Sequence, residues 1–233
     1  MYNMSEIYHV LSRGVDKRKI FLDKGDYFRF IHNLFVLNNQ KVVYTTHYNL
    51  EKFESQNKYV DIASPHIKRE PRKLLANIHA FCLMPNHYHL LLSPSTENGI
   101  PKFMKKLNMA YAKYFNQKHK RKGTLFESRY KAILVSKSNH FLNLPYYIHL
   151  NPLDLEFPEW RERKLNNYNK AINFLNQYRW SSHMDYSNIK NFPSVTDRKL
   201  LLDIFGGEEK YKQSINKWLK EMEIGSMREL VLE

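Results

Sequence analysis

The chain has 233 residues, which is enough for one sizeable domain or for a domain with an extension. Hydrophobic residues make up 42% and aromatic residues 14%, so a packed core is feasible and a disordered chain is excluded as the default. Lys and Arg number 37 against 23 acidic residues, and the resulting net charge of +14 fits a polyanionic partner, foremost nucleic acid. Charge alone does not distinguish DNA from RNA or from an anionic membrane surface.

Cysteine usage and segment hydrophobicity exclude further classes. The single cysteine, Cys82, can form neither an intrachain disulfide nor a cysteine-based zinc motif. Residues 1–6 lack the apolar core of a signal peptide, and no stretch is long enough to span a bilayer. We therefore expect a cytoplasmic protein that has no membrane partner.

The first third of the chain predicts a strand, a helix and an insertion. Residues 7–13 read as a strand, and residues 26–37 place apolar side chains at helical spacing. Asp23 or Asp26 is suited to cap the first turn of that helix. The pattern fades over residues 38–73, which we interpret as an insertion.

The central stretch carries the first candidate for chemistry. Apolar runs at 78–84 and 90–92 predict two buried strands joined by a turn. Because side chains alternate along a strand, His87 and His89 project from one face and Tyr88 from the other. Two imidazoles on one face are half of a metal site. Taken alone, such a pair is more often two ordinary strand histidines.

Further helices and a strand follow. A basic helix begins at Pro101 and leads into a basic turn at 118–123, and residues 124–135 read as a strand. Pro145 predicts a kink or a fresh start in the next helix. Partial helical stripes then cover residues 165–178, 199–205 and 211–222.

Tyr147 and Asn151 lie one turn apart on the same helical face, and Pro152 ends that helix. Such an arrangement presents a phenol and an amide side by side. A phenol has a pKa of about 10, so as a nucleophile it needs help from a neighbouring group or ion.

Cations gather at several places that suit phosphate contacts, with solvated surface charge as the alternative. A basic helix that ends in a basic turn positions nucleic acid without reading its sequence, and two cations flank Tyr130. The candidate DNA-binding residues are Arg13, Lys17, Arg18, Lys105, Lys106, Lys120, Arg121, Lys122, Arg129 and Lys131.

Several segments in fixed order carry a family resemblance. The chain resembles the REP-associated tyrosine transposases, a branch of the single-tyrosine HUH transposases, whose name denotes two histidines around a hydrophobic residue. The segments are Tyr8-His9-Val10 with Arg13-Gly14, Leu83-Met84-Pro85-Asn86-His87-Tyr88-His89-Leu90-Leu91, Gly123-Thr124-Leu125-Phe126, Arg129-Tyr130-Lys131, Tyr147-Ile148-His149-Leu150-Asn151-Pro152 and Tyr178-Arg179-Trp180-Ser181-Ser182.

The resemblance implies an α+β fold: a ferredoxin-like antiparallel sheet with helices on one face, plus a C-terminal helical extension. The catalytic domain would span residues 1–157, with 38–73 as an insertion. Residues 158–233 would form the extension, packed on that domain.

The resemblance also implies the site residues. His87, His89 and Asn151 would hold a divalent metal ion, Mg²⁺ or Mn²⁺, and Tyr147 would be the catalytic nucleophile. Pro145 and Tyr146 depart from the family pattern. Because Tyr146 also precedes Tyr147 directly, only the spacing to Asn151-Pro152 selects Tyr147.

We therefore expect an enzyme, a metal-dependent single-stranded DNA endonuclease and strand transferase (a transposase) that acts through a covalent 5′-phosphotyrosine intermediate. Its partner would be single-stranded or hairpin DNA, and it would be a monomer or a homodimer. The alternative is a non-catalytic DNA- or RNA-binding protein on a domesticated transposase scaffold. A metal-dependent hydrolase that uses water is a third and less favoured hypothesis.

Overall fold

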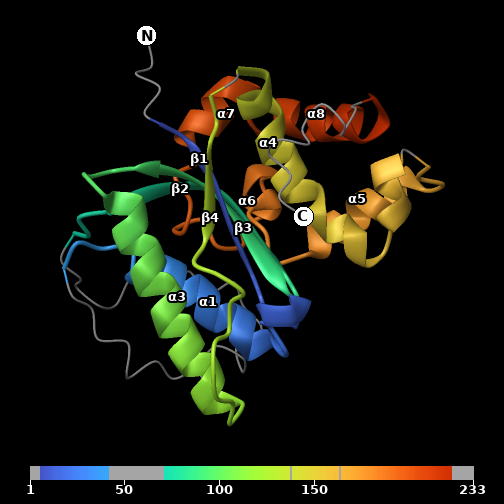
Figure 1. Ribbon diagram of the computed structural model, residues 1–233. Helices are drawn as coiled ribbons and strands as arrows, with labels where there is room; N and C mark the ends of the chain where they lie inside the picture. The colour runs from blue at the N-terminus through green and yellow to red at the C-terminus, as the bar shows by residue number, and fades with distance from the viewer. Residues whose placement is uncertain (1–5, 42–70, 137, 163, 222–233) are drawn as a thin grey trace.

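The computed structural model describes four ranges of the chain, residues 6–41, 71–136, 138–162 and 164–221 (Figure 1). Most of the predicted insertion lies outside these ranges, as do the ends of the chain.

A four-stranded antiparallel sheet forms the centre of the molecule, in the order β2-β3-β1-β4. The long apolar runs of β2 and β3 are buried on both faces of the sheet, as such continuous runs usually are. The prediction of a strand over residues 124–135 was wrong in its length. Residues 127–129 are exposed and polar, so burial does not hold them on the sheet. The strands are β1 (Tyr8–Arg13), β2 (Ala76–Met84), β3 (His87–Pro94) and β4 (Lys131–Leu134).

Helices α1 (Lys24–Val36) and α3 (Gly99–Lys118) pack together on one face of the sheet. Asp23 caps α1, because its side chain accepts a hydrogen bond from the backbone N–H of Asp26 at 3.1 Å. Tyr88 lies in this core, on the face opposite to the histidines, as its place in the strand predicts. The expected α+β class with an antiparallel sheet is confirmed.

Helix α4 (Ser138–Leu150) and the C-terminal helices cover the other face of the sheet (Figure 1). Of the kink or fresh start expected at Pro145, the fresh start does not occur, because one helix runs through this residue. A proline inside a helix costs about 3 kcal/mol. Residues 144 and 146–150 are all buried, so packing on both sides of α4 offsets this cost. The helix ends at Leu150, directly before Asn151-Pro152, as predicted.

The C-terminal part is helical, as expected, and it also completes the sheet edge. Beyond β2, the backbone N–H of Leu83 donates to the carbonyl of Trp180 at 2.8 Å, and the N–H of Ser182 donates to the carbonyl of Phe81 at 3.0 Å. This pairing covers an edge that would otherwise be open to other chains. The helices are η2 (Asn151–Leu155), η3 (Pro158–Glu162), α5 (Tyr168–Gln177), α6 (His183–Tyr186), α7 (Lys199–Phe205) and α8 (Glu208–Glu221).

Among the described residues, no helix combines the length and the apolar character that crossing a membrane requires.

A buried polar network ties α4 to the C-terminal helices. The hydroxyl of Tyr211 lies 2.8 Å from Nδ1 of His149 and 2.8 Å from Nδ1 of His183, so it can donate to one ring and accept from the other. His149 Nε2 lies 2.7 Å from the Oγ of Ser182. Burial lowers the pKa of His183 to about 4 and the pKa of His149 well below its usual value. Both rings are therefore neutral in the folded protein.

These buried histidines predict a loss of stability in acid. In the unfolded chain both bind protons near pH 6.5, but in the folded chain His183 stays neutral down to about pH 4, and burial lowers the pKa of His149 in the same direction. The free energy of unfolding therefore falls as the pH drops from 6.5 to 4, and His183 alone accounts for roughly 3 kcal/mol of the fall. His183→Gln should flatten this slope by that amount in urea unfolding series at several pH values. His140→Gln, at a partly exposed position of α4, is the control. Equal slopes for wild type and His183→Gln would contradict the assignment.

Candidate active site

The two histidines of β3 lie side by side in the sheet face that α4 covers. His87 is 7% exposed and His89 is fully buried. Their ring centroids are 4.9 Å apart and their planes are nearly perpendicular. Across the ladder, His87 stands opposite Arg13 and His89 stands opposite Leu11 on β1.

Both rings are hydrogen-bonded through the same nitrogen. Nδ1 of His87 lies 2.6 Å from the side-chain oxygen of Asn86, and Nδ1 of His89 lies 2.9 Å from Nε2 of His9. An amide oxygen can only accept a hydrogen bond, so His87 carries its proton on Nδ1 and its lone pair on Nε2. A metal-binding histidine usually has this arrangement, with one nitrogen held by a neighbour and the other available to the metal.

Tyr147 lies against this pair from the other side. Its ring is fully buried in α4 and meets the ring of His89 edge to face, with 6.0 Å between centroids. The side-chain amide of Asn151 donates to the backbone carbonyl of Tyr147 at 2.9 Å. The amide nitrogen of Asn151 is thereby engaged, so its oxygen is the atom of this side chain that would act as a ligand. The fold thus places His87, His89, Tyr147 and Asn151 in one neighbourhood.

Arg161 belongs to this neighbourhood, although the sequence did not single it out. Two of its guanidinium nitrogens, Nε and Nη2, contact Asp154 at 2.8 and 2.6 Å. Nη2 also lies 3.4 Å from the side-chain oxygen of Asn151, and the guanidinium carbon lies 5.5 Å from the centroid of the Tyr147 ring. Arg161 is in η3, between two of the segments that carry the family resemblance, and its spacing from Asp154 matches no recognisable motif. Only the tertiary structure brings it to the phenol.

Three of the predicted DNA-binding cations line one cavity. Arg18, Lys120 and Arg121 surround a hollow of about 430 Å³ together with Lys19 and His119. Apolar side chains complete its lining, namely Leu22, Phe115 and Leu125. A hollow with a basic rim and an apolar lining matches the two parts of a nucleotide, which are an anionic phosphate and a flat base.

This basic cavity lies at the same end of the sheet as the histidines. The backbone N–H of Gly14 donates to the carbonyl of Asn86, and the N–H of Ile20 donates to the carbonyl of Pro85, both at 2.8 Å. The turn that carries Arg18 is therefore packed on the turn that leads directly into His87.

The other predicted cations are dispersed. The ammonium group of Lys106 donates to the backbone carbonyls of Asn39 at 2.6 Å and Lys41 at 3.2 Å, a contact that holds the loop after α1. Arg13 is half-buried at the end of β1, opposite His87. The remaining predicted cations are exposed and do not line the basic cavity, namely Lys17, Lys105, Lys122, Arg129 and Lys131.

A second cavity, of about 590 Å³, opens at the opposite end of the strands, where Tyr8, Pro94 and Tyr130 contribute to its lining. None of the predicted site residues lines it. Although this cavity is larger than the basic cavity, it is therefore not part of the candidate site around His87 and His89.

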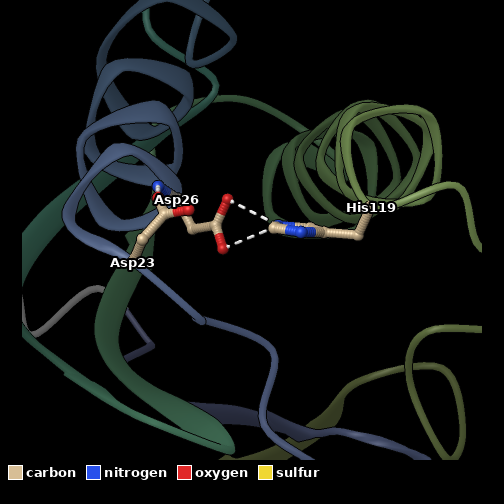
Figure 2. Close-up of side chains that lie close together, drawn as sticks. All are labelled: Asp23, Asp26 and His119. Atoms are coloured by element: carbon tan, nitrogen blue, oxygen red, sulfur yellow. Dashed lines mark hydrogen bonds and ion pairs between the residues drawn. The ribbon is translucent and has the colours of Figure 1, made fainter.

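A different cluster has metal-ligand spacing, namely Asp23, Asp26 and His119 (Figure 2). It already contains a cation, the ammonium group of Lys118. The ammonium group of Lys118 lies 2.7 Å from Asp23 and 2.9 Å from Asp26, and His119 lies 3.0 Å from Asp26. Partial burial works against the charge of Lys118, but the bonds to the two carboxylates outweigh it and raise its pKa. The cluster is therefore an ionic lock between α1 and α3.

Comparison with known proteins gives two matches. The family model "Transposase IS200 like" matches residues 31–151, which is just over half of the chain. The chain is also similar to a solved structure of a REP-associated tyrosine transposase bound to a REP hairpin, at 12% identity and a TM-score of 0.47. That match covers 84% of this chain and 92% of the other. No curated protein matches the sequence.

The lock between α1 and α3 predicts a structural and metal-independent effect. Asp26 is fully buried and accepts hydrogen bonds from Lys118, Tyr114 and the backbone of Leu22. Asp26→Asn should lower the free energy of unfolding by roughly 2–3 kcal/mol, because it removes the buried partner of a cation. The exposed Asp16 pairs with Arg18 at 3.3 Å, and Asp16→Asn should change stability by less than about 0.5 kcal/mol.

The measurement is urea unfolding of both variants with and without Mn²⁺. If Mn²⁺ stabilised the wild type and Asp26→Asn abolished that gain, the cluster would be a metal site instead.

Proposed function

Because this chain belongs to the family of IS200-like transposases, which are DNA-processing enzymes, we propose that it is a metal-dependent single-stranded DNA endonuclease and strand transferase. In this proposal it acts through a covalent 5′-phosphotyrosine intermediate. The observation that carries the proposal is the contact between the ring of Tyr147 and the ring of His89, with His87 alongside. A pure binding protein has no need for this combination in a buried position.

The residues fit a divalent ion. Nε2 of His87 and of His89, together with the side-chain oxygen of Asn151, would hold it. The ion would polarise the scissile phosphate and offset the charge that develops on it. Two imidazoles suit Mn²⁺ better than Mg²⁺, which prefers an all-oxygen shell.

Tyr147 would attack the phosphorus atom of a phosphodiester. The phenolic oxygen forms a bond to phosphorus, and the bond from phosphorus to the 3′ oxygen of the preceding nucleotide breaks. The phenol gives up its proton, and the departing 3′ oxygen takes one up. The reverse attack by a 3′-hydroxyl reseals a strand, so no nucleotide cofactor is needed. Arg161, whose guanidinium packs over the ring of Tyr147, would stabilise the phenolate.

The basic cavity would hold the DNA backbone next to the reacting phosphate. Arg18, Lys19 and Lys120 would contact phosphates, while the exposed Leu22 would lie against a base. Because the turn carrying Arg18 packs on the turn before His87, a strand held here would lie close to the proposed metal site. We also propose that residues 1–157 are the catalytic domain and that residues 158–233 are its extension.

One observation favours the second candidate, a non-catalytic DNA- or RNA-binding protein. Tyr147 is fully buried, and Arg161 packs over its ring. In this arrangement a phosphodiester cannot reach the phenol until η3, which carries Arg161, moves away. The two candidates differ in whether the chain forms a covalent bond to DNA.

The nucleophile is tested by Tyr147→Phe, with Tyr146→Phe as the matched control. Tyr146 packs against Phe205 and Tyr211 in the C-terminal core. Wild type and Tyr146→Phe should form a denaturant-resistant adduct with labelled single-stranded hairpin DNA and Mn²⁺, while Tyr147→Phe should form none. An adduct in Tyr147→Phe would exclude Tyr147 as the nucleophile. The absence of an adduct in wild type, despite tight DNA binding, would support the non-catalytic candidate.

The basic cavity is tested by the double change Arg18→Ala with Lys120→Ala. Each lost phosphate contact on single-stranded DNA should reduce the slope of log affinity against log salt by about 0.7, so the slope should fall by about 1.4. The control, Lys199→Ala with Lys210→Ala, removes the same charge from exposed positions on α7 and at the start of α8. Fluorescence anisotropy over a salt series provides the measurement. Equal slopes for the two double variants would refute the assignment.

A further inference from the structure

His9 and His89 share one hydrogen bond in a fully buried position. Nε2 of His9 lies 2.9 Å from Nδ1 of His89, and the rings stack with 5.1 Å between centroids. Both side chains have no solvent exposure. The pair lies diagonally across the ladder, because His9 stands opposite Leu91 and His89 stands opposite Leu11.

The direction of this bond decides what His89 can do. Only one proton lies between the two nitrogens, so one ring donates and the other accepts. If His9 donated, a neutral His89 would carry its own proton on Nε2, and that nitrogen could not bind a cation. If His89 donates from Nδ1, its lone pair is on Nε2, as in His87. Only the second arrangement gives two imidazoles with matching lone pairs.

We propose that His9 is a positioning residue for the candidate metal site, accepting the Nδ1 proton of His89 and so holding His89 in its metal-binding tautomer. This inference rests on the proposed function, because it assumes that His87 and His89 hold the ion. Asn86 acts on His87 in the same way, through its side-chain oxygen. The two ligands would thus be oriented from two different elements, the strand β1 and the turn before β3.

A purely structural role for His9 predicts something different. If the bond only satisfied two buried polar rings, its direction would not matter, and replacing His9 would change stability without a specific effect on metal affinity. The two roles therefore separate in a binding measurement made on folded protein.

The experiment is Mn²⁺ titration of the full chain by calorimetry, for wild type, His9→Gln, His9→Leu and His89→Ala. Gln keeps an oxygen that can accept the proton from His89, and Leu has no acceptor. His9→Leu should bind Mn²⁺ about 10–100-fold more weakly than wild type. His9→Gln should stay within a few-fold of wild type, and His89→Ala should lose the site. Circular dichroism and urea unfolding establish that each variant is folded.

The outcomes distinguish a failure of the role of His9 from a failure of the proposed metal site. Wild-type affinity in His9→Leu would overturn the role of His9 and leave the proposed metal site intact. Equal weakening in His9→Gln and His9→Leu would also overturn it, because retaining an acceptor would then have no effect. If wild type bound no Mn²⁺, the proposed metal site would fail and this inference with it.

A second readout needs neither metal nor a variant. In ¹⁵N-histidine-labelled wild type, two-bond proton–nitrogen spectra report which ring nitrogen carries the proton. The proposal expects Nδ1 of His89 to be protonated. A proton on Nε2 of His89 would overturn it even if every variant failed to fold.

Discussion

The packing of α4 against the two central strands is the constraint on which the rest of the structure depends. One side of the helix packs on β2 and β3, and its other side contacts the C-terminal helices. Because apolar side chains are buried on both sides, the helix can neither rotate nor slide without opening a densely packed core. His149 adds directional bonds to Tyr211 and Ser182. The position of Tyr147 beside His89 follows from this double burial.

The buried histidines form two groups on either side of α4, and the two groups have different roles. His9, His87 and His89 lie on the sheet and are held through specific ring nitrogens. His149 and His183 lie behind α4, where burial keeps them neutral and Tyr211 joins them. The first group presents lone pairs to the candidate site. The second group anchors the helix that carries the phenol.

Antiparallel topology gathers the candidate chemistry at one end of the sheet. In an antiparallel pair the end of β1 lies beside the start of β3, so Arg13 stands opposite His87. The basic turn after β1 therefore packs on the turn that precedes β3. The basic turn after α3 reaches the same place, where Lys120 and Arg121 join Arg18 around one cavity. Cations far apart in the sequence thus share a surface next to the histidines.

The sequence by itself determined the two buried central strands, the shared face of His87 and His89, and the end of α4 before Pro152, while the class of fold came from the family resemblance that its motifs carry. These features depend on local rules, namely the alternation of side chains along a strand, helical spacing and the restriction that proline imposes. The family motifs lie in the same segments. The metal and nucleophile roles of His87, His89, Asn151 and Tyr147 stay predictions, although their side chains lie in one neighbourhood.

Only the tertiary structure decided which groups from distant segments meet. It placed Arg161 over Tyr147, His9 against His89 and Lys118 between two carboxylates, and it buried the phenol completely. In the tertiary structure the strand predicted at 124–135 is shorter, residues 131–134, and α4 continues through Pro145. These outcomes depend on long-range burial and on pairings between residues far apart in the chain, which local spacing does not encode. For the same reason, the sequence does not predict the hydrogen bond between His9 and His89, because it forms only when β1 pairs with β3.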